Sequence, residues 1–182
     1  MSSGTVILYL VLLFVCVVLS AFFSSSETAF LSLQRVRLKH EVNTKVKGAE
    51  RVARLIEQPG RLLSTILLGN NLVNTAAAAL ATALAMELWD ENPGGAVAVA
   101  TAAVTVVLLV FAETTPKTIA AQHGARLSAL YAGPIEWLSR LLRPAVVLLS
   151  WIASAFSRLA GGAPVPRSLA GEEEIRMMIS VG

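Results

Sequence analysis

Three short stretches of the sequence place oxygen-bearing side chains at helical spacing inside apolar surroundings. In "LSAFFSSSETAFL", Ser20, Ser24 and Glu27 are spaced i, i+4 and i+7, so a helix would carry them along one stripe. In "LLGNNLVNTAAAALAT", Asn70 and Asn74 again have i, i+4 spacing. Polar groups within a bilayer are costly, so we expect these side chains to face one another or water.

The third stretch, "VTVVLLVFAETTPK", combines a carboxylate with a helix breaker. Thr105 and Glu113 fall about two turns apart on a similar stripe. Pro116 lacks an N–H and crowds the carbonyl of Ala112, so we expect a kink and a main-chain oxygen without its helical partner. Gly69, in the second stretch, is a second residue that disfavours regular helix. Free carbonyls at membrane depth are tolerated where they line a cavity or bind an ion.

These groups form an all-oxygen donor set of hydroxyls, amides, carboxylates and carbonyls. Such a set suits the hard cations Mg²⁺, Ca²⁺ and Mn²⁺ or an alkali ion, and serves zinc and copper poorly. Cys16 is the single cysteine, and His40 and His123 fall outside the polar stripes. The sequence has no nucleophile–base pair, phosphate-binding glycine loop or cysteine metal motif, so we do not expect an enzyme.

Each stretch also has a simpler interpretation. Ser24 to Glu27 matches the Ser-x-x-Glu capping box, which would merely start the next helix. The asparagines and the alanines at 76–79 could be contacts between closely packed helices. Glu113 could pair with Lys117 one turn later. Any one of these is plausible, but three polar stripes on three segments favour a shared site.

Long uncharged runs would carry the three stretches. The chain has 182 residues, of which 55% are hydrophobic and only 15% are charged. A bilayer core of about 30 Å needs roughly 20 helical residues, so we predict spans at about 4–27, 61–87 and 94–115. The long N-terminal run with no preceding Lys or Arg disfavours a cleaved signal peptide. The sequence therefore predicts an all-α membrane protein with three spans.

Charges between the spans predict an orientation. Basic residues outnumber acidic ones in 28–61, whereas the link between the second and third spans holds Glu87, Asp90 and Glu91 and no basic residue. The positive-inside rule then puts the N-terminus outside and the C-terminus in the cytoplasm. We predict a cytosolic helix pair over 28–58, either facing anionic headgroups or simply solvated.

The C-terminal part mixes tryptophans and arginines with leucines. Over 131–159 this pattern predicts an interfacial juxtamembrane helix, with a tilted fourth span as the alternative. "GGAPVPR" then indicates a linker. We therefore assign 1–160 to a transmembrane domain and 161–182 to a linker.

Taken together, "LSAFFSSSETAFLSL", "LLGNNLVNTAAAALAT" and "FAETTPKTIAAQH" resemble the membrane domain of the CorC/cyclin M (CNNM) magnesium transporters. The resemblance covers nearly the whole chain. It implies three spans with a belt-like juxtamembrane helix, a homodimer, and a cytosolic pair of CBS modules that bind ATP. That CBS region would begin near where this sequence stops and is expected to be absent from it.

The resemblance also implies a set of metal ligands. The serine pair of the family falls on Ser20 and Ser24, and its Gly-Asn falls on Gly69 and Asn70. Its Glu-x-x-Pro falls on Glu113 and Pro116. The expected metal-site residues are Ser20, Ser24, Ser25, Gly69, Asn70, Asn74, Ala112 and Glu113, with Pro116 as a structural kink. The family often has glycine where this chain has Ser25, which leaves open whether Ser24, Ser25 or Ser26 contacts the ion.

The resulting hypothesis is a homodimeric Mg²⁺ transporter of the inner (plasma) membrane. We expect it to export Mg²⁺ by alternating access, with Na⁺ as a candidate coupling ion and no nucleic-acid partner. A membrane-anchored Mg²⁺ sensor that does not itself transport is the main alternative, and an ion channel is the second. The transporter and the sensor would need the same site.

Overall fold

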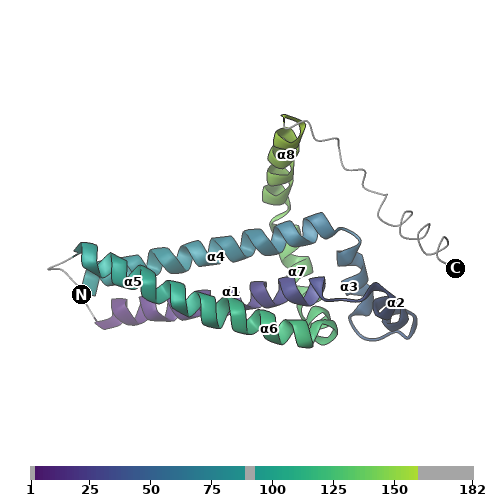
Figure 1. The fold of residues 1–182 in the computed structure, drawn as a ribbon, viewed down its shortest axis with the longest axis horizontal. Coiled ribbons are helices and arrows are strands. Elements are labelled where there is room, and N and C mark those ends of the chain that lie inside the picture. Colours follow the sequence, from purple (N-terminus) through teal and green to yellow (C-terminus); the bar gives the residue numbers. More distant parts are fainter. Residues whose placement is uncertain (1–2, 89–92, 160–182) are drawn as a thin grey trace. The chain divides into compact units, whose positions relative to one another are not determined.

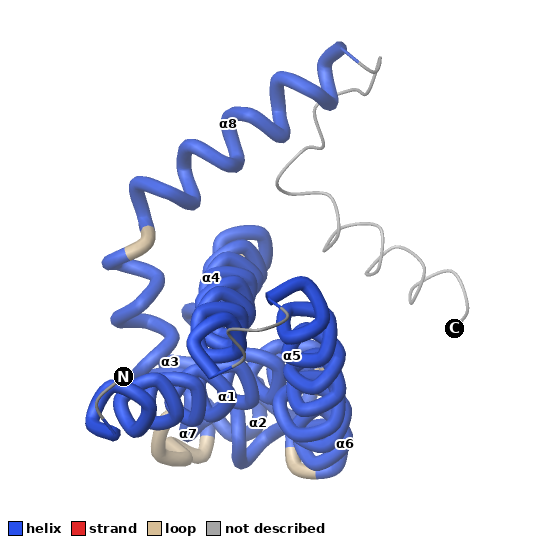
Figure 2. The backbone as a smooth tube through the Cα atoms, turned by 90° about the vertical axis from the view of Figure 1, so that its left-hand side faces the viewer, coloured by secondary structure: helices blue, strands red, loops and turns tan. Residues whose placement is uncertain are grey.

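In a computed structural model, which describes residues 3–88 and 93–159, the chain is built of helices and short connections. No strand occurs in that described part (Figure 2). The elements in order are α1 (Ser3–Leu31), α2 (Arg35–Asn43), α3 (Ala49–Ile56), α4 (Pro59–Leu88), α5 (Pro93–Val107), the π-helix η1 (Leu108–Thr114), α6 (Thr115–Gln122), α7 (Gly124–Leu141) and α8 (Arg143–Leu159). The predicted all-α fold is confirmed.

Among the described residues, three helical segments are long and apolar enough to cross a membrane, as predicted from the uncharged runs. They are Gly4–Leu31, Pro59–Leu88 and Gly94–Gln122, and the last joins α5, η1 and α6 end to end. These segments run side by side, with α1 contacting α4, η1 and α6 (Figure 1). Many of their apolar side chains, such as Phe14 and Phe111, are exposed, which is the surface that lipid would cover.

The first span does not end at the serine cluster. The capping-box interpretation of Ser24 to Glu27 is wrong, because α1 continues through it to Leu31. A capping serine accepts a bond from a main-chain N–H at the start of a helix. The Ser26 hydroxyl instead donates to the Phe22 carbonyl, one turn back within α1.

The third span extends beyond the predicted 94–115 range because Pro116 is tolerated. Pro116 lies in the first turn of α6, where a missing N–H is least costly. The backbone departs from α geometry just before it, in the π-helix Leu108–Thr114. There the Thr115 N–H donates to the Val110 carbonyl, five residues back. The irregularity predicted at Pro116 is thus a wide turn preceding it.

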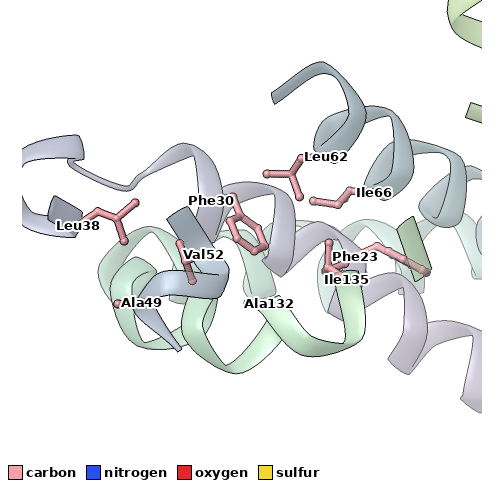
Figure 3. Packing of buried hydrophobic residues seen from close by; sticks show 9 residues of the cluster. All are labelled: Phe23, Phe30, Leu38, Ala49, Val52, Leu62, Ile66, Ala132 and Ile135. Carbon is pink, nitrogen blue, oxygen red and sulfur yellow. The ribbon is translucent and has the colours of Figure 1, made fainter. Parts of the chain in front are cut away.

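The basic segment between the first two spans forms two short helices, α2 and α3. They lie with α7 at the end of the bundle where α1 ends and α4 begins (Figure 1). Phe30, Leu62, Ile66 and Ile135 are among the buried residues that join these helices to the spans (Figure 3). Gly48, at φ +91°, connects α2 to α3, and a Cβ there would lie 3.3 Å from Ala129 Cβ on α7.

The predicted juxtamembrane segment 131–159 is divided between two helices. The structure starts α7 earlier, at Gly124, and interrupts the helix at Leu142. Pro144 explains the interruption, since a proline lacks the N–H that would continue the helix by donating to the carbonyl of Arg140, four residues back. The chain separates into two compact units at this point, and α8 belongs to the second. The predicted linker 161–182, and Asp90 and Glu91 of the acidic turn, lie outside the described residues.

Candidate cation site

The polar stripes of the first two spans meet. The Ser20 hydroxyl lies 2.6 Å from Oδ1 of Asn74 and 3.1 Å from Oδ1 of Asn70, and its one proton is placed between these two acceptors, closer to Asn74. Ser20 is only 1% exposed. The i, i+4 spacing of the asparagines places both amides on the face of α4 that contacts α1. Three side-chain oxygens are therefore gathered at one point between two spans.

Gly69 permits this approach. A Cβ at this position would overlap the ring of Phe23 on α1, at 2.5 Å from Cε1. The absence of a side chain lets α1 and α4 come together one residue before Asn70. The sequence suggested Gly69 as a source of a carbonyl ligand, and the structure adds a packing reason for a glycine there.

The three consecutive serines of α1 have different partners. The Ser25 hydroxyl donates to the hydroxyl of Tyr131 on α7 at 3.1 Å, and Ser26 donates to the main chain. The Ser24 hydroxyl is buried and has no hydrogen-bond partner among the described residues. An unsatisfied buried hydroxyl costs about 1–3 kcal/mol, so it calls for an explanation such as a bound ion or water. Ser24 lies one turn from Ser20 on the predicted stripe.

The π-helix supplies main-chain oxygen atoms beside α1. Ala112 is fully buried, and η1 contacts α1. The Thr115 N–H donates to Val110, so it is not available to the Phe111 carbonyl, and Pro116 has no N–H to donate to Ala112, four residues back. Both carbonyl oxygens therefore lose one main-chain donor that a regular helix would provide. This is the backbone environment in which ion-binding carbonyls occur in membrane helices.

Glu113 is not hydrogen-bonded to the serine–asparagine cluster. Its Oε1 lies 3.2 Å from Nζ of Lys117, and its side chain is 49% exposed. The same Nζ lies 3.4 Å from Oε2 of Glu27 on α1. The i, i+4 pair with Lys117 that the sequence allowed is therefore present. The bond of Lys117 to Glu27 joins α6 to α1, and no sequence spacing could reveal it.

The site has few formal charges. Within residues 3–88 and 93–159, no three His, Cys, Asp or Glu side chains gather where they could hold a metal ion. A cation between these spans would therefore be bound mainly by hydroxyl, amide and carbonyl oxygens, with Glu113 as the carboxylate predicted from the sequence. Oxygen ligands of this kind suit Mg²⁺, Ca²⁺ or alkali ions.

Comparison with known proteins identifies relatives. Residues 11–182 match the family model of the cyclin M transmembrane N-terminal domain. A UPF0053 protein of Haemophilus influenzae is 37% identical over 171 residues, which cover 93% of this chain and 40% of the relative. The UPF0053 inner membrane protein YfjD of Escherichia coli is 41% identical over 143 residues, covering 79% of this chain and 33% of the relative.

A UPF0053 protein of Synechocystis is 31% identical over an alignment that covers all of this chain and 43% of the relative. The chain thus spans less than half the length of these relatives. The family match and the three apolar helices agree on a multi-pass membrane protein. The chain belongs to the cyclin M (CNNM) transmembrane-domain family.

Proposed function

We propose that this protein binds Mg²⁺ as cargo among α1, α4 and η1 and exports it from the cytoplasm. The observation that carries the proposal is the oxygen cluster of Ser20, Asn70 and Asn74 beside the unpartnered hydroxyl of Ser24. Mg²⁺ takes six oxygen ligands and gives up its water reluctantly. A preformed group of neutral oxygens offers a replacement for part of that water shell.

Ion binding would redirect the hydrogen bonds of the cluster. The Ser20 proton now points to the asparagine Oδ1 atoms. On binding, these amide oxygens and the lone pairs of Ser20 and Ser24 would turn to the ion. The carbonyl oxygen atoms of Gly69 and Ala112 are the main-chain candidates, and Ser25 is a weaker one because it is bonded to Tyr131.

Charge compensation would come from Glu113. In the structure its carboxylate is paired with Lys117, which also reaches Glu27. We propose that an arriving Mg²⁺ competes with the Lys117 ammonium for Glu113, and that Lys117 then stays with Glu27. The protein would thereby keep the carboxylate neutralised when no ion is present, which avoids an unpaired charge at membrane depth.

Transport would proceed by alternating exposure of the site through movement of α1 against the other two spans. The basic segment containing α2 and α3 favours a cytoplasmic position for that end of the bundle. This orientation puts the N-terminus outside. The inner membrane location named for the Escherichia coli relative supports an inner-membrane location for this protein. A homodimer and coupling to Na⁺ rest on the family resemblance alone.

Purified protein in liposomes tests the proposal. We expect wild type to bind Mg²⁺ in calorimetry and to move it across the liposome membrane, measured with an enclosed Mg²⁺-sensitive dye. Asn70→Ala should lose both properties. Asn71→Ala is the matched control, because Asn71 is the neighbouring asparagine on the exposed side of α4.

The outcomes separate the candidate functions. Binding without movement would indicate a membrane-anchored sensor, and rapid flux that does not saturate would indicate a channel. Equal Mg²⁺ affinity in wild type and Asn70→Ala would contradict the site.

A further inference from the structure

We propose that a pocket between α3, the first turn of α4 and α7 binds the phosphate group of an anionic phospholipid. The pocket has a volume of about 200 Å³. Arg54 of α3, Arg61 of α4 and Arg140 of α7 line it, together with Gln58 and Glu136. Three guanidinium groups from three helices thus surround one small cavity. Guanidinium groups bind phosphate oxygens through paired N–H donors.

The pocket has more positive than negative charge. Glu136 is the single carboxylate that lines it. It is also paired with Arg51, which lies outside the pocket lining. The distances to Glu136 are 2.9 Å from Arg140, 3.1 Å from Arg51 and 3.8 Å from Arg54. One carboxylate cannot neutralise three guanidinium groups, so an anion would be favoured here.

Arg61 adds a further positive group with unused donors. Its Nη2 donates to the carbonyl oxygen of Ser139 at 3.1 Å, while its buried Nε finds no hydrogen-bond partner within residues 3–88 and 93–159. In the described part of the chain it makes no ion pair. Arg61 also lies in the first turn of α4, where the helix dipole contributes partial positive charge. A phosphate in the pocket would supply the acceptors that Arg61 lacks.

The depth of the pocket points to a lipid as the source of the phosphate. Arg61 is the last charged residue before the uncharged run that begins at Leu62, so it lies at headgroup level if α4 spans the bilayer. Trp137, next to Glu136 on α7, is 64% exposed. Exposed tryptophans beside a span are typical of the same interfacial layer. At that depth anionic headgroups are the abundant phosphates.

Native mass spectrometry of the purified protein tests the proposal, with phosphatidylglycerol or phosphatidylcholine as the added lipid. We expect wild type to retain phosphatidylglycerol in preference to phosphatidylcholine. Removing one arginine near a headgroup costs about 1 kcal/mol, so Arg140→Gln should weaken phosphatidylglycerol binding about fivefold. Arg61→Gln should weaken it as well.

Arg37→Gln is a matched control for Arg140→Gln. Both arginines are exposed and both pair with a glutamate at i, i+4 spacing, at 3.0 Å for Arg37 and 2.9 Å for Arg140. The two variants therefore have the same net charge and lose the same type of ion pair. Since the Arg140 side chain is 71% exposed, its replacement should leave the fold intact.

Three results would overturn the proposal. The first is equal retention of the two lipids by wild type. The second is equal phosphatidylglycerol affinity in Arg140→Gln and Arg37→Gln. The third is complete displacement of the lipid by millimolar inorganic phosphate, which would identify a site for a soluble anion.

Discussion

The hydroxyl of Ser20 lies 2.6 Å from Oδ1 of Asn74, and the two residues belong to different membrane spans. This bond connects α1 to α4 where neither helix can hydrogen-bond to water if both span the bilayer. It also aligns a hydroxyl oxygen and an amide oxygen of the proposed site. If the proposed site binds Mg²⁺, stability and ion binding would therefore depend on the same pair of residues.

Replacing both members of this pair tests the coupling. Ser20→Ala and Asn74→Ala should each lower Mg²⁺ affinity about tenfold or more, because each removes an oxygen ligand. The Mg²⁺ affinity of the double variant should fall by less than the product of the two single-variant factors, since both residues bind the same ion. Calorimetric titration with Mg²⁺ provides the measurement. Unchanged affinity in both single variants would exclude these ligands.

Gly69→Ala should separate α1 from α4. The added methyl group would overlap the Phe23 ring, and overpacking of this kind costs about 1–3 kcal/mol. We expect a lower midpoint of thermal unfolding together with weaker Mg²⁺ binding. A partial recovery in Gly69→Ala/Phe23→Leu would trace both effects to this contact.

Gly60→Ala is the control for that variant. Gly60 also lies in α4, but a Cβ there would meet no atom within 4 Å. Its replacement should leave Mg²⁺ affinity unchanged and should not lower the unfolding midpoint. If Gly69→Ala and Gly60→Ala change the unfolding midpoint and the Mg²⁺ affinity equally, contact with Phe23 is not the cause of those changes.

Lys117→Met should raise Mg²⁺ affinity several-fold. Removal of the ammonium frees Glu113 from its competitor and removes a positive charge that repels the ion. Glu27→Gln should act in the opposite direction, because Lys117 would then bind Glu113 alone. Lys117→Arg keeps the charge and should change the affinity least. Equal affinities in these three variants and wild type would show that Lys117 does not compete with Mg²⁺.

The serine cluster offers a comparison between neighbours. Ser24→Ala should weaken Mg²⁺ binding without lowering stability, because its buried hydroxyl has no partner to lose. Ser25→Ala should lower the free energy of unfolding by about 1 kcal/mol through the lost bond to Tyr131, and leave Mg²⁺ affinity nearly unchanged. Thermal unfolding and Mg²⁺ titration of both variants check this. The reverse pattern would identify Ser25 as the ligand.

Much of the fold could be predicted from the sequence because its signals are local. Uncharged runs identified the three spans, and i, i+4 spacing identified the faces on which Ser20, Asn70 and Asn74 meet. The bonds of Ser25 to Tyr131 and of Glu27 to Lys117 join helices that are distant in the chain, so no spacing reports them. The extension of α1 from the predicted end at residue 27 to Leu31 was missed, because a capping box and a buried serine stripe have the same sequence pattern.

The π-helix also explains why Glu113 could not be placed by spacing. The expectation that Thr105 and Glu113 share a stripe assumed regular α geometry between them. Instead, η1 occupies residues 108–114, and its wide turns shift the phase of everything that follows. Thr105 is exposed and donates to the carbonyl oxygen of Thr101. The predicted stripe of Thr105 and Glu113 therefore does not run continuously along one face of the third span.

The wide turns of η1 have a consequence for motion. A hydrogen-bonded turn of a π-helix contains one residue more than that of an α-helix, so η1 contains more residues per turn than the rest of the third span. Closing one such turn to α geometry would rotate the residues beyond it by about 100° around the helix axis. Glu113 and Lys117 would then swing relative to α1 while α5 stayed in place. Such a change would turn the Glu113 carboxylate toward or away from the proposed Mg²⁺ site by rotation within the third span, without translation of any helix across the bilayer.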